Sequence, residues 1–158
     1  MPEQKRVMIS STARDLPEHR KEVMDACLRQ SFFPVMMEHL PASDDDAIQE
    51  SMQMVDEAQI YLGILAFRYG YVPKGHDISI TGMEYNRAGE RGIPRLMFVM
   101  HEDHAVRVGD VEMGEGAEKL KGRGNDARVV HLRFDGLERG GRRAARDPRR
   151  LRARRQAL

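Results

Sequence analysis

The sequence predicts an α/β fold whose parallel, doubly wound sheet of five strands carries helices on both faces. Short apolar runs alternate along the chain with segments in which apolar residues recur at helical spacing. The run from Ile60 to Phe67 is apolar at nearly every position, as expected of a central strand covered on both faces. Strands that are separated by single helices of about ten or more residues require parallel, right-handed crossovers.

The first half of the chain contains two predicted strands and two predicted helices. Arg6 to Ser10 is expected to be a buried strand that opens into a polar loop, and a helix follows it. Phe32 to Met37 is the second strand, and Pro34 favours an edge position because proline has no N–H to donate. Ser43 is predicted to cap a helix from about Asp44 to Val55.

The second half continues the alternation after the central strand. A turn-rich loop leads into a helix that ends at Gly92, and Arg95 to Met100 forms the fourth strand. A short helix from Glu115 to Gly122 and a strand from Arg128 to Phe134 complete the repeat. The flavodoxin-like strand order 2-1-3-4-5 fits best, and it places a ligand crevice beyond the carboxyl ends of strands one and three.

Composition indicates a soluble globular chain. Of the 158 residues, 41% are hydrophobic and 32% are charged. The longest apolar run is far shorter than the span of about 20 residues that crosses a membrane. The N-terminus lacks the apolar stretch of a secretory signal, so we expect a cytoplasmic protein. The single cysteine, Cys27, is expected to be a buried thiol.

Charge divides the chain into a predicted α/β domain at residues 1–135 and a basic tail at residues 136–158. The tail carries nine arginines and two acids, which leaves a net charge of −6 on the domain. Its glycines and proline replace the helix expected to close the sheet. The tail is either disordered or the product of a reading-frame change near Lys121 to Asn125 or after Phe134. Nucleic-acid binding by the tail ranks last, because it has no aromatic residue to stack on bases.

Common catalytic motifs do not account for a function. The stretch "HEDH", His101 to His104, lacks the further ligands of a zinc site, so no metal is predicted. No G-x-S-x-G turn supports a serine nucleophile. The stretch "GRGND", Gly122 to Asp126, is not a phosphate-binding loop, because it neither follows a strand nor contains the Lys-Ser/Thr pair.

One carboxylate occupies an unexpected position. Counting in fours from Ile80 gives Glu84 and then Ala88, which places an acid on an apolar side of a helix. Glu84 either pairs with Arg87, a surface contact worth a few tenths of a kcal/mol, or lies at the edge of a pocket.

The predicted crevice gathers polar and aromatic residues around Glu84. They come from the ends of the first and third strands: Ser10, Ser11, Thr12, Phe67, Arg68 and Tyr69. Plainer explanations remain open, since Arg68 could pair with Asp56 or Glu57 and the tyrosine could belong to a packed turn. Together these residues form the default pocket hypothesis.

Four stretches identify a family resemblance: VMISSTARDLPEHR, FFPVMMEHLPASDDD, DEAQIYLGILAFRYGYVP and SITGMEYNRAGERGIPRLMFV. In this order and spacing they resemble the bacterial domain of unknown function 4062, over about Arg6 to Glu112. That family is similar to Toll/interleukin-1 receptor (TIR) domains and nucleoside deoxyribosyltransferases, which share a flavodoxin-like sheet. The resemblance therefore implies a TIR-like domain.

The resemblance also implies an activity. In the related enzymes, a glutamate on the helix after the central strand acts on an N-glycosidic bond of NAD or a nucleoside, and Glu84 fits that position. Arg68 and the backbone of Ser10 and Ser11 would then hold a diphosphate, and Phe67 or Tyr69 would stack on a ring. NAD or a nucleotide would be a substrate, and no cofactor is implied.

Two departures from the family pattern stand out. Thr81-Gly82-Met83-Glu84-Tyr85 replaces the more common Thr-Glu-x-Glu-Tyr, and Ala13 stands where an aromatic residue is usual. The alternative function is a non-catalytic interaction module that forms homo-oligomers or belongs to a larger bacterial signalling protein.

Overall fold

The computed structural model describes residues 3–12, 16–37, 43–100, 104–123 and 130–134. Parallel strands in the order β2-β1-β3-β4 form the body of its sheet, with bounds β1 Arg6–Ser11, β2 Phe33–Val35, β3 Ile60–Leu65 and β4 Arg95–Met100. The backbone of β5 (Val130–Phe134) pairs in parallel with β4. The order of the first four strands confirms the flavodoxin-like prediction.

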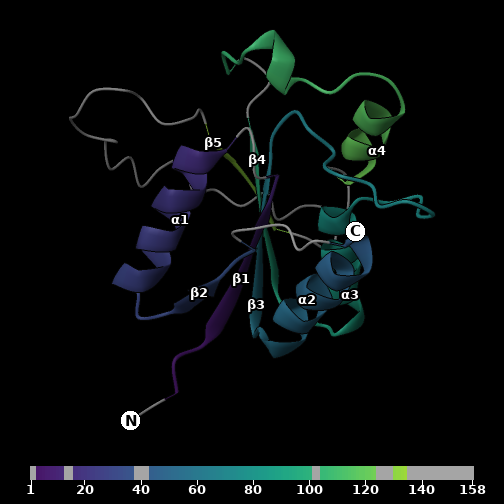
Figure 1. Ribbon diagram of the computed structural model, residues 1–158. Coiled ribbons are helices and arrows are strands. Elements are labelled where there is room, and N and C mark those ends of the chain that lie inside the picture. The colour runs from purple at the N-terminus through teal and green to yellow at the C-terminus, as the bar shows by residue number, and fades with distance from the viewer. Residues whose placement is uncertain (1–2, 13–15, 38–42, 101–103, 124–129, 135–158) are drawn as a thin grey trace, which may run out of the picture.

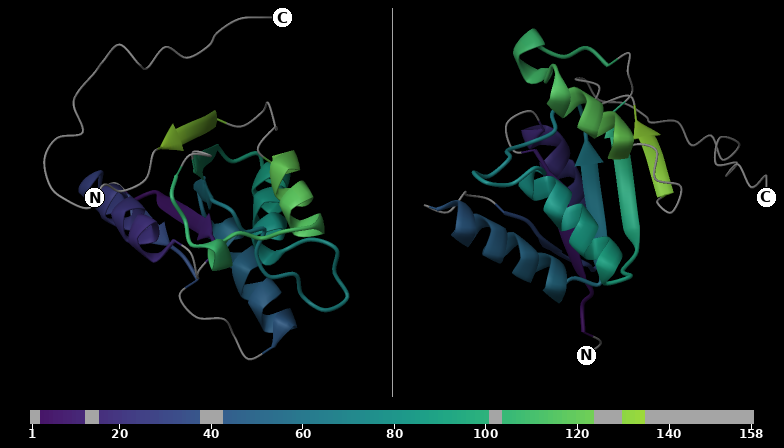
Figure 2. Two further views of the ribbon diagram at one scale, coloured as in Figure 1. Left: turned by 90° about the horizontal axis from the view of Figure 1, so that it is seen from above. Right: turned by 90° about the vertical axis from the view of Figure 1, so that its right-hand side faces the viewer.

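Helices cover the sheet on both faces, as Figure 1 shows. The helix α1 (Pro17–Arg29) lies on one face, and α2 (Asp44–Glu57) and α3 (Ile80–Glu90) lie on the other. Leu120 of α4 (Glu115–Arg123) packs against the core on the side of α2 and α3. The 3-10 turn η1 (Val108–Asp110) lies beyond the carboxyl ends of the strands (Figure 2).

Alternate residues of β1, β3 and β4 enter two separate cores. One core, on the side of α2 and α3, contains Met8, Val55, Ala58, Tyr61, Leu65, Tyr85, Ala88 and Met97. The other, on the side of α1, contains Val7, Ile9, Leu16, Cys27, Leu62, Ile64 and Met100. Because side chains alternate along a strand, Ser10 shares the direction of Met8 and points toward α2 and α3.

Helix starts and ends follow local chemistry. Ser43 caps α2 as predicted, since its Oγ accepts a hydrogen bond from the backbone N–H of Asp46 at 3.2 Å. Ser79 caps α3 in the same way, with the N–H of Gly82 at 3.2 Å. Gly92 adopts a positive φ of 66° just after α3, which confirms the predicted helix end.

Two strands are shorter than predicted. β2 comprises three residues where six were expected, and it lies at the edge position that Pro34 favours. β3 ends at Leu65 rather than Phe67, so Phe67 belongs to the following loop. Cys27 is buried as predicted, and burial raises the pKa of its thiol.

Several predictions fall outside the described residues, among them the tail at 136–158 and the stretch from His101 to Asp103. In the part of the chain that the structure describes, no helix is long and apolar enough to span a bilayer. The same part holds no group of three or more His, Cys, Asp or Glu side chains arranged to bind a metal ion.

Candidate active site around Glu84

Glu84 lies on the inner side of α3, facing the sheet and α2. Its side chain belongs to a residue that is only 5% exposed, and Ile80 and Ala88, one turn away on each side, are buried as well. The helical spacing that suggested an acid on an apolar side therefore describes the structure correctly. A carboxylate in this position needs hydrogen-bond donors, because burial removes its contact with water.

Two serine hydroxyls supply those donors. Ser10, near the end of β1, donates to Oε2 of Glu84, and Ser51, in the middle of α2, donates to Oε1 at 2.8 Å. Both serines are buried, with exposed fractions of 2% and 0%. A strand and two helices thus meet at one carboxylate, each of whose oxygens accepts a hydroxyl. We call these three residues the Ser-Glu-Ser cluster.

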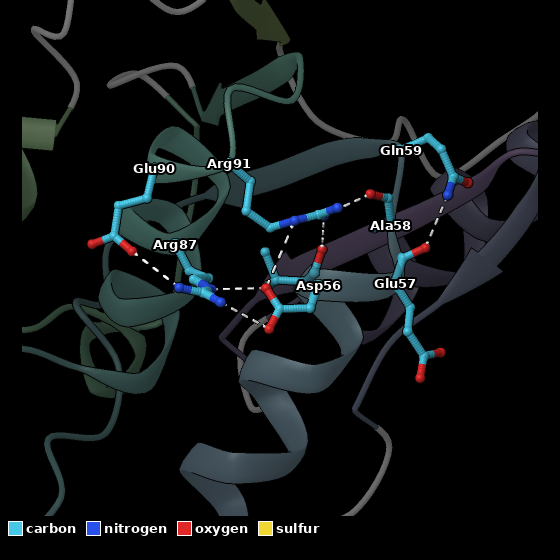
Figure 3. Close-up of polar contacts among 8 residues, drawn as sticks. Asp56, Glu57, Ala58, Gln59, Arg87, Glu90 and Arg91 are labelled. Atoms are coloured by element: carbon cyan, nitrogen blue, oxygen red, sulfur yellow. Dashed lines mark hydrogen bonds and ion pairs between the residues drawn. The ribbon is translucent and has the colours of Figure 1, made fainter.

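The alternative in which Glu84 pairs with Arg87 is wrong. Arg87 instead binds Asp56 of α2 through two contacts, Nε to Oδ1 at 2.7 Å and Nη2 to Oδ2 at 3.0 Å (Figure 3). The Arg87 guanidinium, mainly through this hydrogen bonding, lowers the pKa of Asp56 below its usual value. Arg87 and Glu84 lie three residues apart and both face α2, but Arg87 meets Asp56 at the exposed rim of this helix contact, whereas Glu84 is buried.

Arg91 extends the contact between the two helices. Its Nη1 donates to the backbone oxygens of Val55 at 2.6 Å and Ala58 at 2.8 Å, at the carboxyl end of α2 (Figure 3). The cation therefore adds a charged donor to the carbonyl of Val55, which also accepts the backbone N–H of Ala58 at 3.2 Å, and to the carbonyl of the C-cap residue Ala58. Together with the pair between Arg87 and Asp56, it fixes α2 against α3, and that fixed contact holds Ser51 opposite Glu84.

The loop after β3 comes close to the end of β1. A Cβ placed on Gly70 would lie 3.2 Å from Cγ2 of Thr12 and 3.4 Å from Oγ1 of Thr81. Gly70 also has a φ of 95°, which other residues rarely adopt. Thr12, the loop and the first turn of α3 are therefore neighbours, and Glu84 lies one turn further along that helix.

The segment after β4 holds the loop of Phe67, Arg68 and Tyr69 in place. The backbone N–H of Glu112 donates to the carbonyl of Phe67 at 2.8 Å, and its carboxylate accepts from the N–H of Tyr69 at 2.6 Å. Arg68 donates to the carbonyl of Gly109 at 3.2 Å. The loop therefore has a defined backbone conformation at the carboxyl edge of the sheet.

The proposed partners of Arg68 are engaged elsewhere. Asp56 binds Arg87, and Glu57 binds Arg6, so neither acid explains Arg68. Tyr69 is 3% exposed and lies in the interior, which agrees with the packed-turn alternative. Phe67 and Arg68 are half-buried. A ligand could therefore reach these two residues more readily than Tyr69.

The predicted site residues fall into two groups. Ser10 and Glu84 are in direct contact and buried, whereas Ser11, Thr12, Phe67 and Arg68 are half-buried along the same edge of the sheet. Ser11 is aligned with Ile64 of β3, which sets the ends of β1 and β3 side by side.

Sequence reasoning missed Ser51, Ser79 and Glu112. A signal for Ser51 was present, because counting in fours from Ala47 gives Ser51 and then Val55, all three of which are buried. This is the same pattern that singled out Glu84. Serine is small enough to pass as a core residue, so its hydroxyl becomes meaningful only once a buried acceptor is known.

Comparison with known proteins found matches among solved structures and one protein family. No curated protein matches the sequence. Among solved structures, a 2-desoxiribosyltransferase from Leishmania mexicana aligns with a TM-score of 0.48 and 16% identity, covering 72% of this chain and 76% of its own. The CMP N-glycosidase BcmB of Clostridium botulinum aligns with a TM-score of 0.46 and 14% identity, covering 84% and 90%. The family model of the domain of unknown function DUF4062 matches residues 6–132, and the chain therefore belongs to that family.

Proposed function

We propose that this domain breaks the N-glycosidic bond of NAD or of a nucleoside or nucleotide, with Glu84 as the key carboxylate. The observation that carries the proposal is the Ser-Glu-Ser cluster, a buried acid whose two oxygens are held by hydroxyls from β1 and α2. The cluster lies near the carboxyl end of β1, where sheets of this order bind their ligands. The TIR-like pattern of the sequence supports the same reading.

The reaction needs an anion beside the sugar. When the bond between C1′ and the ring nitrogen breaks, its electron pair leaves with the nitrogen and positive charge develops on the sugar. A carboxylate that faces C1′ stabilises this charge or bonds to the carbon, and water then supplies the hydroxyl that ends on C1′. From NAD the nicotinamide leaves as a neutral molecule without taking a proton, whereas most nucleobases need one.

Fixed hydroxyl donors suit this task. Ser10 and Ser51 hold the Glu84 carboxylate in one orientation, so little reorganisation is needed when charge appears on the sugar. The half-buried loop residues Phe67 and Arg68 supply a ring surface and a cation on the same edge.

The direct test replaces Glu84 with glutamine. The purified protein is incubated with NAD and with a ribonucleoside monophosphate, and free nicotinamide or free base is measured by chromatography. Glu84→Gln keeps the shape of the side chain and removes its charge, so the rate is expected to fall by about 100-fold or more. Glu90→Gln, a change of the same kind at an exposed position of the same helix, is the matched control.

Two results separate the candidates. If Glu84→Gln cleaves as fast as the wild type, Glu84 does not act on the bond. If the wild type releases neither nicotinamide nor base at any protein concentration, the result contradicts the proposed cleavage and favours the alternative of a non-catalytic interaction module. The assay is therefore run at low and high protein concentrations, since assembly can be required for activity. We place the proposed activity in a cytoplasmic bacterial signalling or defence protein.

A further inference from the structure

A second charged side chain approaches the end of β1 from the opposite face of the sheet. Arg20 of α1 donates from Nη2 to the carbonyl of Met37 at 2.8 Å. Its Nη1 donates to Oγ of Ser11 at 3.1 Å and lies 3.5 Å from the carbonyl of the same residue. Arg20 is half-buried, and its contacts place the guanidinium at the carboxyl ends of β1 and β2.

These contacts hold the Arg20 side chain without neutralising it. In the part of the chain that the structure describes, every acceptor of Arg20 is a carbonyl or a hydroxyl. Arg68 resembles it, because it donates to the carbonyl of Gly109. Arg87, which is also half-buried, differs because it pairs with the carboxylate of Asp56.

Among the described residues, Arg20 and Arg68 are two cations without a paired carboxylate, in contrast to the net negative charge of the domain. Residues 1–135 carry a net charge of −6, so the average field of the domain repels anions. Arg20 and Arg68 nevertheless lie at the ends of neighbouring strands, β1 and β3, at the point where this type of sheet binds ligands. A guanidinium has five N–H donors, and those not used by backbone oxygens remain for an anion.

Ser10 and Ser11 relate these cations to the Ser-Glu-Ser cluster. Because neighbouring side chains of a strand point to opposite faces, Ser10 reaches Glu84 and Ser11 reaches Arg20. A ligand that lies across the end of β1 would meet a carboxylate on one side and a guanidinium on the other. The end of such a ligand that faces the carboxylate should carry or develop positive charge, and the end that faces the guanidinium should be negative.

We propose that Arg20, together with Arg68, binds a phosphate group of the substrate, so that the domain acts on phosphorylated nucleosides or dinucleotides in preference to free nucleosides. This inference rests on the proposed function, because it names the substrate class of the same site. The sugar carbon that develops positive charge lies toward Glu84, and the phosphate lies toward Arg20. Planar guanidinium groups suit phosphate oxygens, with which they form paired, charge-assisted hydrogen bonds.

A purely structural role makes a different prediction. If Arg20 only joins α1 to the ends of β1 and β2, its replacement lowers stability and leaves the discrimination between phosphorylated and unphosphorylated ligands unchanged. If it binds phosphate, the variant loses affinity for the anion in particular. The comparison between matched ligands is therefore more informative than a loss of activity.

The first experiment uses inorganic pyrophosphate as the probe and requires no catalysis. Isothermal titration of the full chain is expected to show binding by the wild type and by Glu84→Gln. Binding should be weakened about 10- to 100-fold in Arg20→Gln, a loss typical of one charged hydrogen-bonded contact. Arg29→Gln, at an exposed position near the other end of the same helix, changes the net charge equally and should bind like the wild type.

The second experiment compares substrates. The ratio of kcat/KM for a nucleoside monophosphate to that for the same nucleoside is expected to fall about 10-fold or more in Arg20→Gln and to stay constant in Arg29→Gln. The corresponding pair of NAD and nicotinamide riboside distinguishes a diphosphate from a single phosphate. Arg20→Lys retains the charge without the planar fork, and an intermediate ratio is expected.

The outcomes separate the two proposals. Pyrophosphate that fails to bind the wild type overturns the phosphate site even where cleavage is observed. Cleavage with an unchanged ratio in Arg20→Gln also overturns it, and leaves the function of Glu84 intact. Binding that depends on Arg20 without any cleavage supports the phosphate site and contradicts the proposed reaction. Should Arg20→Gln fail to fold, the same measurements on Arg20→Lys and Arg68→Gln decide.

Discussion

Replacing Glu84 with alanine is expected to destabilise the fold far more than replacing it with glutamine. Alanine removes the acceptor of two buried hydroxyls, those of Ser10 and Ser51. Leaving a buried polar group without a partner costs about 1 to 3 kcal/mol. Two such groups, less the relief of no longer burying a carboxylate, give an expected loss of about 2 to 5 kcal/mol.

Glutamine retains both contacts. Its amide oxygen can accept from one serine, and its amide nitrogen can donate to the hydroxyl oxygen of the other. The free energy of unfolding of Glu84→Gln should therefore lie within about 1 kcal/mol of the wild type. The contrast between the two variants corresponds to a difference in melting temperature of roughly 5 to 15 °C for a chain of this size.

Urea denaturation followed by circular dichroism measures this difference. Glu90→Ala serves as the control, because the side chain of Glu90 is exposed and its loss should change the stability by less than about 0.5 kcal/mol. If Glu84→Ala proves as stable as Glu84→Gln, the hydroxyls of Ser10 and Ser51 do not depend on Glu84. That result would contradict the proposal that the two serines hold Glu84 as a functional acid.

Three further predictions concern the surroundings of the cluster. Arg87 holds the pKa of Asp56 below its ordinary value of about 3.9. The ion pair therefore stabilises the fold fully above that pH and progressively less as the pH falls. In urea denaturation between about pH 5 and pH 3, the stability of Asp56→Asn should decrease less with falling pH than that of the wild type. Ser51→Ala should lower kcat of any cleavage about 10-fold or more with KM little changed, as steady-state kinetics would show. Gly63→Ala should cost about 1 to 3 kcal/mol in the same urea assay, because its Cβ would overlap the terminal atoms of the buried Met97 side chain.

Elements whose signals are local could be predicted closely. β4 has the predicted bounds, and Ser43 caps α2 because the cap depends only on the next three residues. β2 is shorter than its apolar run: as an edge strand it pairs only with β1, from Phe33 opposite Arg6 to Val35 opposite Met8. Apolar character thus located the strand but did not determine how much of it pairs.

The candidate site could be predicted only in part. The position of Glu84 was visible because an acid interrupts an apolar pattern within one helix. Its partner Ser10 lies 74 residues away in the sequence, and the strand order brought them to one edge of the sheet. Ser51 and Arg20 escaped notice, because each acts on a group contributed by another element and neither interrupts its own helical pattern.

The Ser-Glu-Ser cluster is difficult to explain by stability alone. Burying a carboxylate costs free energy, and buried polar groups can often be replaced by apolar residues of similar volume without loss of stability. Replacing Glu84 alone would leave two buried serines without an acceptor, so a more stable core would require changes in β1, α2 and α3 together. The fold therefore contains three polar residues, each of which is favourable only in the presence of the others. Such an arrangement is consistent with our proposal that Glu84 is a reactive acid, because functional groups are where costs in stability recur.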